Sequence, residues 1–265
     1  MEAVTANNIT FNCAIGGVPT APALVFINSL GTDLRIWDGV VPHFATGYRL
    51  VQYDKRGHGL SDCPPAPYSM DDHAHDLAGL LDALAIEQAV LVGVSVGAMI
   101  AQAFAAAWPW RVRGLVLCDT AAVIGTAVFW NTRINYLRQH GLNHETTAPI
   151  LERWFAPAFA QNKPAAHRIY ANMLARMPLE GYVGTCAAIR YADLSQRSRT
   201  IQAPTLVVCG AEDSATPPNL THTLLDLIPL ASYREIPGVG HLPCVEQPEE
   251  YAAALTGFLK EVGHD

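Results

Sequence analysis

The chain has 265 residues, of which 50% are hydrophobic and 15% are charged, and its formal net charge at pH 7 is −7. This composition is that of a folded globular protein and excludes intrinsic disorder. The acidic balance, without a run of Lys or Arg, argues against nucleic acid or an anionic membrane surface as a partner.

The N-terminus and the cysteines bear on the location of the protein. Residues 1–12 lack a basic region followed by an apolar core, and no uninterrupted apolar run approaches the ~18 residues of a membrane span. The cysteines are scattered without a Cys-x-x-Cys pair, so the sequence predicts neither a disulfide framework nor a zinc site. We therefore expect a cytoplasmic protein.

Three strands are predicted in the first part of the chain. Residues 9–15 alternate between apolar and polar side chains like a half-buried strand, and residues 23–27 form the continuous apolar run of a fully buried one. A third strand is expected at 48–53. The polar loop 28–32 follows the second of these strands, at the end where an α/β sheet places its binding groups.

The next segment combines a glycine-rich turn with the start of a helix. His58 lies in the turn 54–61, and we interpret it as part of a packed corner rather than as a catalytic group. Ser69 opens a helix with a capping box, and apolar residues recur along it at helical spacing. His73 and His75 lie two residues apart near its start and so point to different faces, which argues against a metal site there.

The most informative stretch is Gly-Val-Ser-Val-Gly at residues 93–97. The apolar strand 89–92 precedes it and a helix of small residues begins at Ala98, so Ser95 lies at a tight turn between a buried strand and a helix. The glycines let the strand and the helix approach, and the turn leaves the serine hydroxyl exposed above the helix N-terminus. This pattern is typical of a nucleophile elbow. The alternative is a glycine-rich turn with an ordinary serine.

The regular alternation of strand and helix stops after the next predicted strand, at 114–118. From residue 125 to residue 199 we find no convincing strand, and Pro, Gly or Asn separates several helix-like segments. These segments are 127–140, 145–155, 164–177 and 181–191. We interpret this stretch as a helical insertion into a parallel α/β core.

The alternation resumes toward the C-terminus. The expected elements are a strand at 204–210, a helix at 219–227, a strand at 233–236 and a final helix at 246–262. Asp213 and His241 each follow one of these strands, at the edge of the sheet where Ser95 emerges. The order Ser, Asp, His is that of the α/β-hydrolase fold among serine hydrolases. Glu212 is a neighbouring carboxylate that could act as the acid, and the spacing from the strand favours Asp213.

With these residues in place, the chain resembles the α/β-hydrolases over essentially its whole length, including the turn at 54–61 and an inserted cap. More narrowly, the stretches NSLGTDLRIWD, LCDTAA followed by IGTAVFWNTRI, and ERWFAPAF resemble the 3-oxoadipate enol-lactonases of bacterial aromatic-acid degradation. Two positions depart from that pattern. Ala98 stands where many relatives have glycine, and Asp119 stands where asparagine is expected.

The resemblance implies an α/β fold with a mostly parallel central sheet flanked by helices and a helical cap inserted after the strand that follows the nucleophile helix. We expect residues 1–122 and 200–265 to form the α/β-hydrolase core and residues 123–199 to form the cap. The histidines show no ligand cluster and there is no Gly-x-Gly-x-x-Gly fingerprint, so we expect no metal and no organic cofactor. The oligomeric state stays open.

The activity implied by the resemblance is hydrolysis of a small anionic lactone, 3-oxoadipate enol-lactone, to 3-oxoadipate. His241 would accept the proton of Ser95 as the serine attacks the lactone carbonyl, while Asp213 fixes the imidazole tautomer. Water would then hydrolyse the acyl-enzyme with His241 again as base. The oxyanion needs two donors, for which the backbone amides of Val96, at the helix start, and Leu30, in the polar loop, are the candidates.

A substrate carboxylate calls for a cation, and arginine offers a planar bidentate donor. Trp130 and Arg133 lie three residues apart on one face of the first cap helix, where the indole could cover the lactone ring and the guanidinium could bind the carboxylate. Alternatively, Trp130 belongs to the core of the cap and Arg133 is a solvated surface charge. Trp154 and Arg190 are the next candidates.

Other functions on the same fold stay open. A broad carboxylesterase or a cofactor-free perhydrolase would use the same triad, and a preference for lactones over p-nitrophenyl esters separates the esterase from the lactonase. A lyase of the hydroxynitrile type and a ligand receptor without turnover are further alternatives. Dehalogenases and epoxide hydrolases of this fold place an aspartate at the elbow, so Ser95 argues against both.

Overall fold

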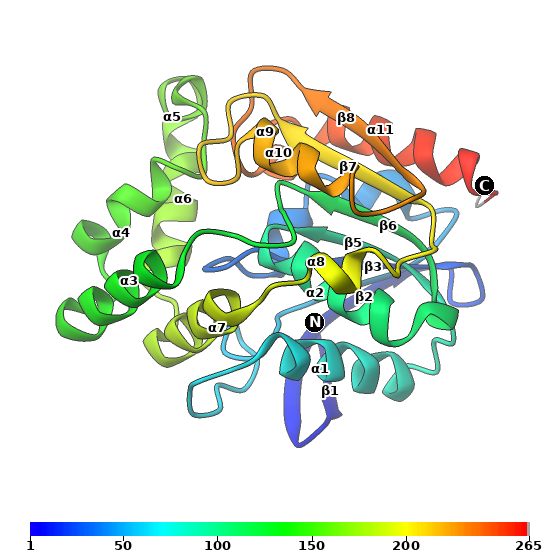
Figure 1. Ribbon diagram of the computed structural model, residues 1–265, viewed down its shortest axis with the longest axis horizontal. Coiled ribbons are helices and arrows are strands. Elements are labelled where there is room, and N and C mark those ends of the chain that lie inside the picture. The colour runs from blue at the N-terminus through cyan, green and yellow to red at the C-terminus, as the bar shows by residue number, and fades with distance from the viewer. Residues whose placement is uncertain (264–265) are drawn as a thin grey trace.

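One eight-stranded sheet runs through the molecule (Figure 1). The structure is a computed structural model that describes residues 1–263. The spatial order of the strands is β1-β2-β4-β3-β5-β6-β7-β8. Their bounds are β1 Glu2–Ala6, β2 Ile9–Gly17, β3 Ala23–Ile27, β4 Arg49–Tyr53, β5 Ala89–Val94, β6 Val112–Cys118, β7 Thr205–Gly210 and β8 Ala231–Ile236.

The sheet is antiparallel at one edge and parallel elsewhere. β1 pairs with β2 and β2 with β4 in antiparallel register, whereas all pairs from β4 through β3 to β8 are parallel. β3, β5 and β7 are buried along their whole length, which explains why they read as continuous apolar runs. Because the parallel strands all end at the same edge, the loops that follow them converge there.

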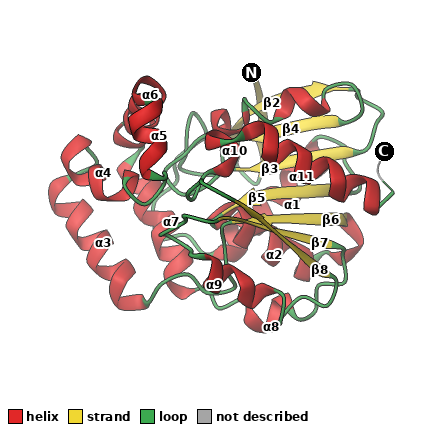
Figure 2. Cartoon of the chain, turned by 90° about the horizontal axis from the view of Figure 1, so that it is seen from above, coloured by secondary structure: helices red, strands yellow, loops and turns green. Residues whose placement is uncertain are grey.

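Helices cover both faces of the sheet (Figure 2). α1 (Met70–Ala83) and α2 (Val96–Ala107) lie on one face, and α11 (Pro248–Glu261) lies on the other. α1 begins at the predicted capping box of Ser69 and buries apolar residues that include Leu77, Leu80 and Leu81. The short helices α8 (Ser195–Ser198), α9 (Pro218–Thr221) and α10 (Pro243–Glu246) lie in connecting segments. Within residues 1–263, no helix is long and apolar enough to cross a membrane.

Five further helices, which we call the cap helices, separate β6 from β7 in the sequence. They are α3 (Ala127–His140), α4 (His144–Leu151), α5 (Pro157–Asn162), α6 (Pro164–Ala175) and α7 (Leu179–Tyr191). They gather at one end of the sheet, on the left of Figure 1. Thr126 caps the first of them by accepting a hydrogen bond from the Phe129 amide. The cap helices therefore stand beside the edge where the parallel strands end.

Several elements differ from the sequence-based expectation. The N-terminal strand β1, which pairs with β2 in an antiparallel hairpin, was not predicted, and neither was α5. The helix expected at 219–227 is a single α-helical turn followed by a 3-10 turn. The final helix, expected from residue 246, begins at Pro248, with α10 as a separate turn before it. Proline favours the first turn of a helix, so Pro243 and Pro248 each start a new one.

Candidate active site

Ser95 occupies the turn between β5 and α2. Its φ of 59° lies in the left-handed range that residues with a Cβ rarely adopt. The flanking glycines are required for this turn. A Cβ on Gly93 would lie 2.5 Å from the Gly97 backbone, and a Cβ on Gly97 would lie 2.2 Å from the Ile27 carbonyl oxygen. The Ser95 amide donates to the Cys118 carbonyl at 2.8 Å, which ties the turn to the end of β6.

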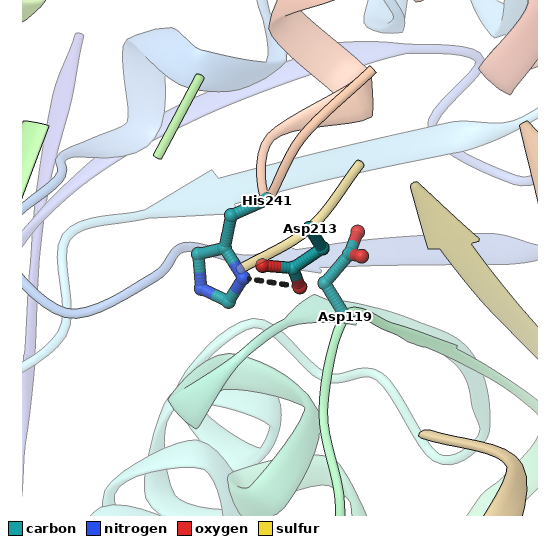
Figure 3. A group of neighbouring side chains, drawn as sticks. All are labelled: Asp119, Asp213 and His241. Atoms are coloured by element: carbon teal, nitrogen blue, oxygen red, sulfur yellow. Dashed lines mark hydrogen bonds and ion pairs between the residues drawn. The ribbon is translucent and has the colours of Figure 1, made fainter. Parts of the chain in front are cut away.

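Asp213 and His241 form a hydrogen-bonded pair (Figure 3). His241 Nδ1–H donates to Asp213 Oδ2 at 2.8 Å, and the Thr216 hydroxyl donates to the same oxygen at 2.7 Å. The amides of Ala215 and Thr216 donate to Oδ1 at 2.6 and 3.1 Å. Burial acts against ionisation, but the charge of His241 and these hydrogen bonds outweigh it and hold the pKa of Asp213 well below its usual range. An ionised Asp213 keeps the proton of His241 on Nδ1 and leaves Nε2 free to act as a base.

A second carboxyl group, that of Asp119, lies beside Asp213 (Figure 3). Burial, and next the charge of Asp213, raise the pKa of Asp119 well above its usual range. Asp119 accepts hydrogen bonds from the Gly210 amide at 2.9 Å and from the Cys118 thiol at 2.8 Å. The raised pKa favours the uncharged acid, which resembles in shape the amide of the asparagine that was expected at this position.

Asp119, Asp213 and His241 also meet the distance requirement of a cation site, since one potential ligand atom of each lies within 4.8 Å of the others. Their chemistry fits a catalytic pair better than a metal centre. The oxygens of both carboxyl groups already accept hydrogen bonds from the protein, and His241 Nδ1 donates to Asp213. The absence of a metal stays a prediction, and loss of activity with a chelator followed by recovery with zinc would contradict it.

The loop that carries His241 is attached to the cap through Glu246. One carboxylate oxygen of Glu246 accepts from the Gly240 amide at 2.7 Å, and the other accepts from the Ala156 amide at 3.1 Å. In addition, the His241 amide donates to the Trp154 carbonyl at 3.0 Å. Burial raises the pKa of Glu246 from its ordinary value of 4.5 to about 7, although the two amide hydrogen bonds oppose the shift.

The raised pKa predicts that Glu246→Gln flattens the dependence of stability on pH. Between pH 4.5 and about 7 the unfolded chain has lost the Glu246 proton while the folded protein retains it, so the free energy of unfolding falls as the pH rises through this window. A shift of this size corresponds to roughly 3 kcal/mol. Urea unfolding at about pH 5 and about pH 8 should show this loss in the wild type and not in Glu246→Gln.

The matched control for this prediction is Glu249→Gln, because Glu249 is an exposed glutamate near the start of α11. The free energy of unfolding of the Glu249→Gln variant should change with pH in parallel with that of the wild type. If Glu246→Gln also follows the wild type in parallel, the pKa of Glu246 in the folded protein is not raised.

Ser95 and His241 line one cavity of about 310 Å³ between the sheet edge and the cap helices. This volume suits a small-molecule ligand. Most of the wall is apolar and aromatic, formed by Leu30, Ile124, Phe129, Trp130, Ile150, Trp154 and Ile189. Polar groups come from Ser29, Thr126, Thr216 and Tyr182, and positive charge from Arg133 and Arg153. Among the described residues that line this cavity, none is Asp or Glu.

The two arginines stand close together over aromatic rings. The Arg133 guanidinium lies 4.7 Å from the centre of the Phe129 ring, and that of Arg153 lies 5.5 Å from the same ring. Burial, and next the charge of Arg133, lower the pKa of Arg153. Within residues 1–263 neither arginine forms an ion pair with an acidic side chain. Two positive charges without a counterion make this part of the cavity a place for an anion.

The structure brings together most of the residues singled out from the sequence. Leu30, Ser95, Trp130, Arg133, Trp154 and His241 all line the cavity. The Trp130 indole N–H donates to the Ile124 carbonyl at 2.6 Å, so the ring is also fixed in the cap. Val96 is the first residue of α2, where backbone amides have no partner within the helix.

Arg190 is placed differently from Arg133. It donates to the Asn131 side chain and stacks on Tyr191, and it is not among the residues that line the cavity. Arg153 and Tyr182, which do line it, were not predicted. Arg153 is next to Trp154 in the ERWFAPAF stretch, which was the available signal. Tyr182 is fully buried, and its hydroxyl has no hydrogen-bond partner within the described residues.

Known proteins are similar to this chain over almost its whole length. The family model of the alpha/beta hydrolase fold matches residues 22–248. 3-Oxoadipate enol-lactonase 2 of Acinetobacter baylyi is 35% identical over 263 residues, which cover 98% of this chain and 96% of the relative. The crystal structure of the enol-lactonase from Burkholderia xenovorans LB400 has a TM-score of 0.94 at 32% identity, with 98% of this chain and 100% of that chain covered. A thermophilic esterase from Thermogutta terrifontis has a TM-score of 0.92 at 26% identity, with 100% and 99% covered. The chain therefore belongs to the α/β-hydrolase family.

Proposed function

We propose that this protein is a serine hydrolase that opens the ring of 3-oxoadipate enol-lactone to give 3-oxoadipate. The observation that carries the proposal is the cavity itself. It joins Ser95 and the Asp213–His241 pair to two arginines without a counterion. The names of the similar proteins from Acinetobacter baylyi and Burkholderia xenovorans support the choice of an enol-lactone.

The first half of the reaction forms an acyl-enzyme on Ser95. His241 Nε2 accepts the serine proton as Oγ attacks the lactone carbonyl carbon, and Asp213 stabilises the imidazolium that results. The amides of Leu30 and Val96 donate to the oxyanion of the tetrahedral intermediate. The ring C–O bond then breaks, and the enol oxygen takes the proton from His241. Since the freed enol becomes a ketone, ring opening is strongly downhill.

The second half of the reaction releases the product. Water enters at the acyl carbon, and His241 accepts its proton as the new C–O bond forms. Collapse of the second tetrahedral intermediate breaks the bond to Ser95, whose oxygen regains a proton from His241. The product is 3-oxoadipate. No step needs a metal or an organic cofactor.

The carboxylate of 3-oxoadipate enol-lactone is carried on an acetate arm, which would bind at the part of the cavity lined by Arg133 and Arg153. Arg133 and Arg153 supply the positive charge, and Tyr182, which lines the same cavity, offers its hydroxyl as a further donor. The apolar remainder of the wall, with Trp130 and Trp154, covers the lactone ring. This arrangement fits a small, flat molecule with one carboxylate.

The proposal is tested by a ring-opening assay on 3-oxoadipate enol-lactone, followed by ultraviolet absorbance. We expect turnover by the wild type that is abolished in Ser95→Ala. If the wild type hydrolyses p-nitrophenyl esters but not the enol-lactone, the serine-hydrolase chemistry would stand and the proposed substrate would be wrong.

We predict that Arg133→Ala separates the two substrates. A charge-assisted hydrogen bond to a carboxylate contributes roughly 1.5–3 kcal/mol, or about 10- to 150-fold. The variant should therefore lose about that factor in kcat/KM for the enol-lactone, while kcat/KM for a neutral p-nitrophenyl ester changes little. Steady-state kinetics on both substrates measures the difference.

Arg190→Ala is the matched control, because Arg190 lies on a cap helix but does not line the cavity. It should leave both rates near those of the wild type. Equal losses on both substrates in Arg133→Ala would mean that this arginine supports the cap instead of binding the carboxylate.

A general carboxylesterase is the second candidate function. The mostly apolar wall of the cavity and the similarity to the Thermogutta terrifontis esterase favour it. The two candidates differ in substrate preference. A lactonase should show a higher kcat/KM for the enol-lactone than for p-nitrophenyl acetate, whereas a general esterase should show the reverse.

A further inference from the structure

The turn after β4 contains two buried side chains that the proposed reaction does not use, Lys55 and His58. Lys55 is 1% exposed and His58 is 0% exposed. Burial of an amine in a protein core is costly, because the group loses its hydration. Both side chains contact the loop that carries Leu30, the candidate oxyanion donor.

Lys55 contacts the peptide group that contains the Leu30 amide. Its Nζ donates to the Ser29 carbonyl oxygen at 2.6 Å. That carbonyl and the Leu30 N–H belong to one planar trans peptide group, so they point in opposite directions. Holding the oxygen therefore sets the direction of the N–H. A donor on the carbonyl also polarises the peptide group, which makes its N–H a stronger donor.

His58 holds the next peptide group along the chain. The Gly31 amide donates to His58 Nε2 at 3.2 Å, and His58 Nδ1 lies 3.1 Å from the Arg56 carbonyl oxygen. Because a carbonyl can only accept, Nδ1 carries the proton and Nε2 is the acceptor. Burial, and next the charge of Lys55, lower the pKa of His58 well below its usual range, which keeps Nε2 free to accept.

We propose that Lys55 and His58 are positioning residues of the oxyanion hole, which fix the peptide groups on both sides of Leu30 so that its amide meets the oxyanion. The role rests on the proposed serine-hydrolase chemistry but not on the identity of the lactone. Neither residue is among those that line the cavity. The Ser29 carbonyl also accepts from the Thr32 hydroxyl at 3.1 Å, so removal of Lys55 leaves it with a partner.

The first test is Lys55→Met, which removes the donor and keeps an unbranched side chain that is one atom shorter. Loss of an oxyanion donor costs about 10²- to 10³-fold in kcat, and misplacement of one should cost part of that. We expect kcat for p-nitrophenyl acetate to fall about 10- to 100-fold, with KM changed less than about threefold. Stability to urea should equal or exceed that of the wild type, because an apolar chain replaces a buried amine.

A trifluoromethyl ketone gives a readout specific to the oxyanion. The Ser95 oxygen adds to its carbonyl carbon, the serine proton passes to His241, and the carbonyl oxygen becomes an oxyanion in the hole. Its inhibition constant in Lys55→Met should rise by about the factor by which kcat/KM falls. An unchanged inhibition constant, or a loss of stability with unchanged kcat, would show that Lys55 is merely structural.

The second test compares His58→Gln with His58→Leu. The Gln amide oxygen can accept from the Gly31 amide, so this variant should retain kcat within about threefold, whereas His58→Leu should lose about tenfold or more. The control is His73→Leu, which removes another buried histidine whose ring contacts Tyr68 and Thr185 instead of the Leu30 loop. Its kcat should match the wild type.

The outcomes separate the positioning role from the proposed function. A wild type that neither hydrolyses the ester nor binds the ketone would contradict the serine chemistry and this role together. An active wild type whose kcat is equalled by both Lys55→Met and His58→Leu would contradict only the role assigned to Lys55 and His58.

Discussion

Ser95→Ala should lower kcat for the enol-lactone by about 10⁴-fold or more and leave the fold intact. In the proposed mechanism the Ser95 hydroxyl oxygen bonds to the acyl group, so its removal ends covalent catalysis and leaves only binding and the oxyanion donors. Stability should not fall, because alanine removes only the hydroxyl oxygen and the residue keeps its backbone hydrogen bond to Cys118. Steady-state kinetics and urea unfolding measure the two effects.

Ser95 and His241 should act as a unit. The double variant Ser95→Ala with His241→Ala is expected to cost little beyond Ser95→Ala alone, since the base has no proton to accept once the nucleophile is gone. Ser232→Ala is the matched control, because Ser232 lies on β8 outside the cavity. Retention of more than a tenth of the activity by Ser95→Ala would refute the mechanism.

Features set by short-range patterns could be predicted from the sequence. The elbow needs glycines at 93 and 97 because the Gly97 and Ile27 backbones leave no room for a Cβ on them, and that need is visible as a motif. The buried parallel strands appear as continuous apolar runs, and Asp213 was placed by its distance from the end of one of them.

Features that depend on long-range packing could not be predicted. β1 has no buried residue, and its pairing with β2 defines it as a strand. Arg153 and Arg190 are both cap arginines, and only the packed cap shows that the first lines the cavity and the second binds Asn131. The hydrogen bonds of Lys55 and His58 link loops that are 26 and 27 residues apart in sequence.

The second large effect is expected for Asp213→Asn, which should lower kcat by about 10⁴-fold although it preserves the shape of the side chain. In the structure, Oδ1 accepts from the Ala215 and Thr216 amides, so the oxygen of the new amide stays at this position. The NH₂ group then faces His241 Nδ1 and makes it an acceptor. The imidazole proton moves to Nε2, which can no longer take the proton of Ser95.

Two isosteric controls on neighbouring carboxyl groups show whether this loss belongs to Asp213 alone. Glu212→Gln changes an exposed side chain next to it in sequence, and Asp119→Asn changes the buried group beside it in space. Both should keep kcat within about twofold, the former because the side chain is solvated and the latter because burial raises the pKa of Asp119 and so favours the uncharged acid, which an amide resembles in shape. A large loss in Glu212→Gln would transfer the role of the acid to that residue. If Asp119→Asn lost as much as Asp213→Asn, the two carboxyl groups would be acting as a pair that shares one charge, and the imidazole would be oriented by both.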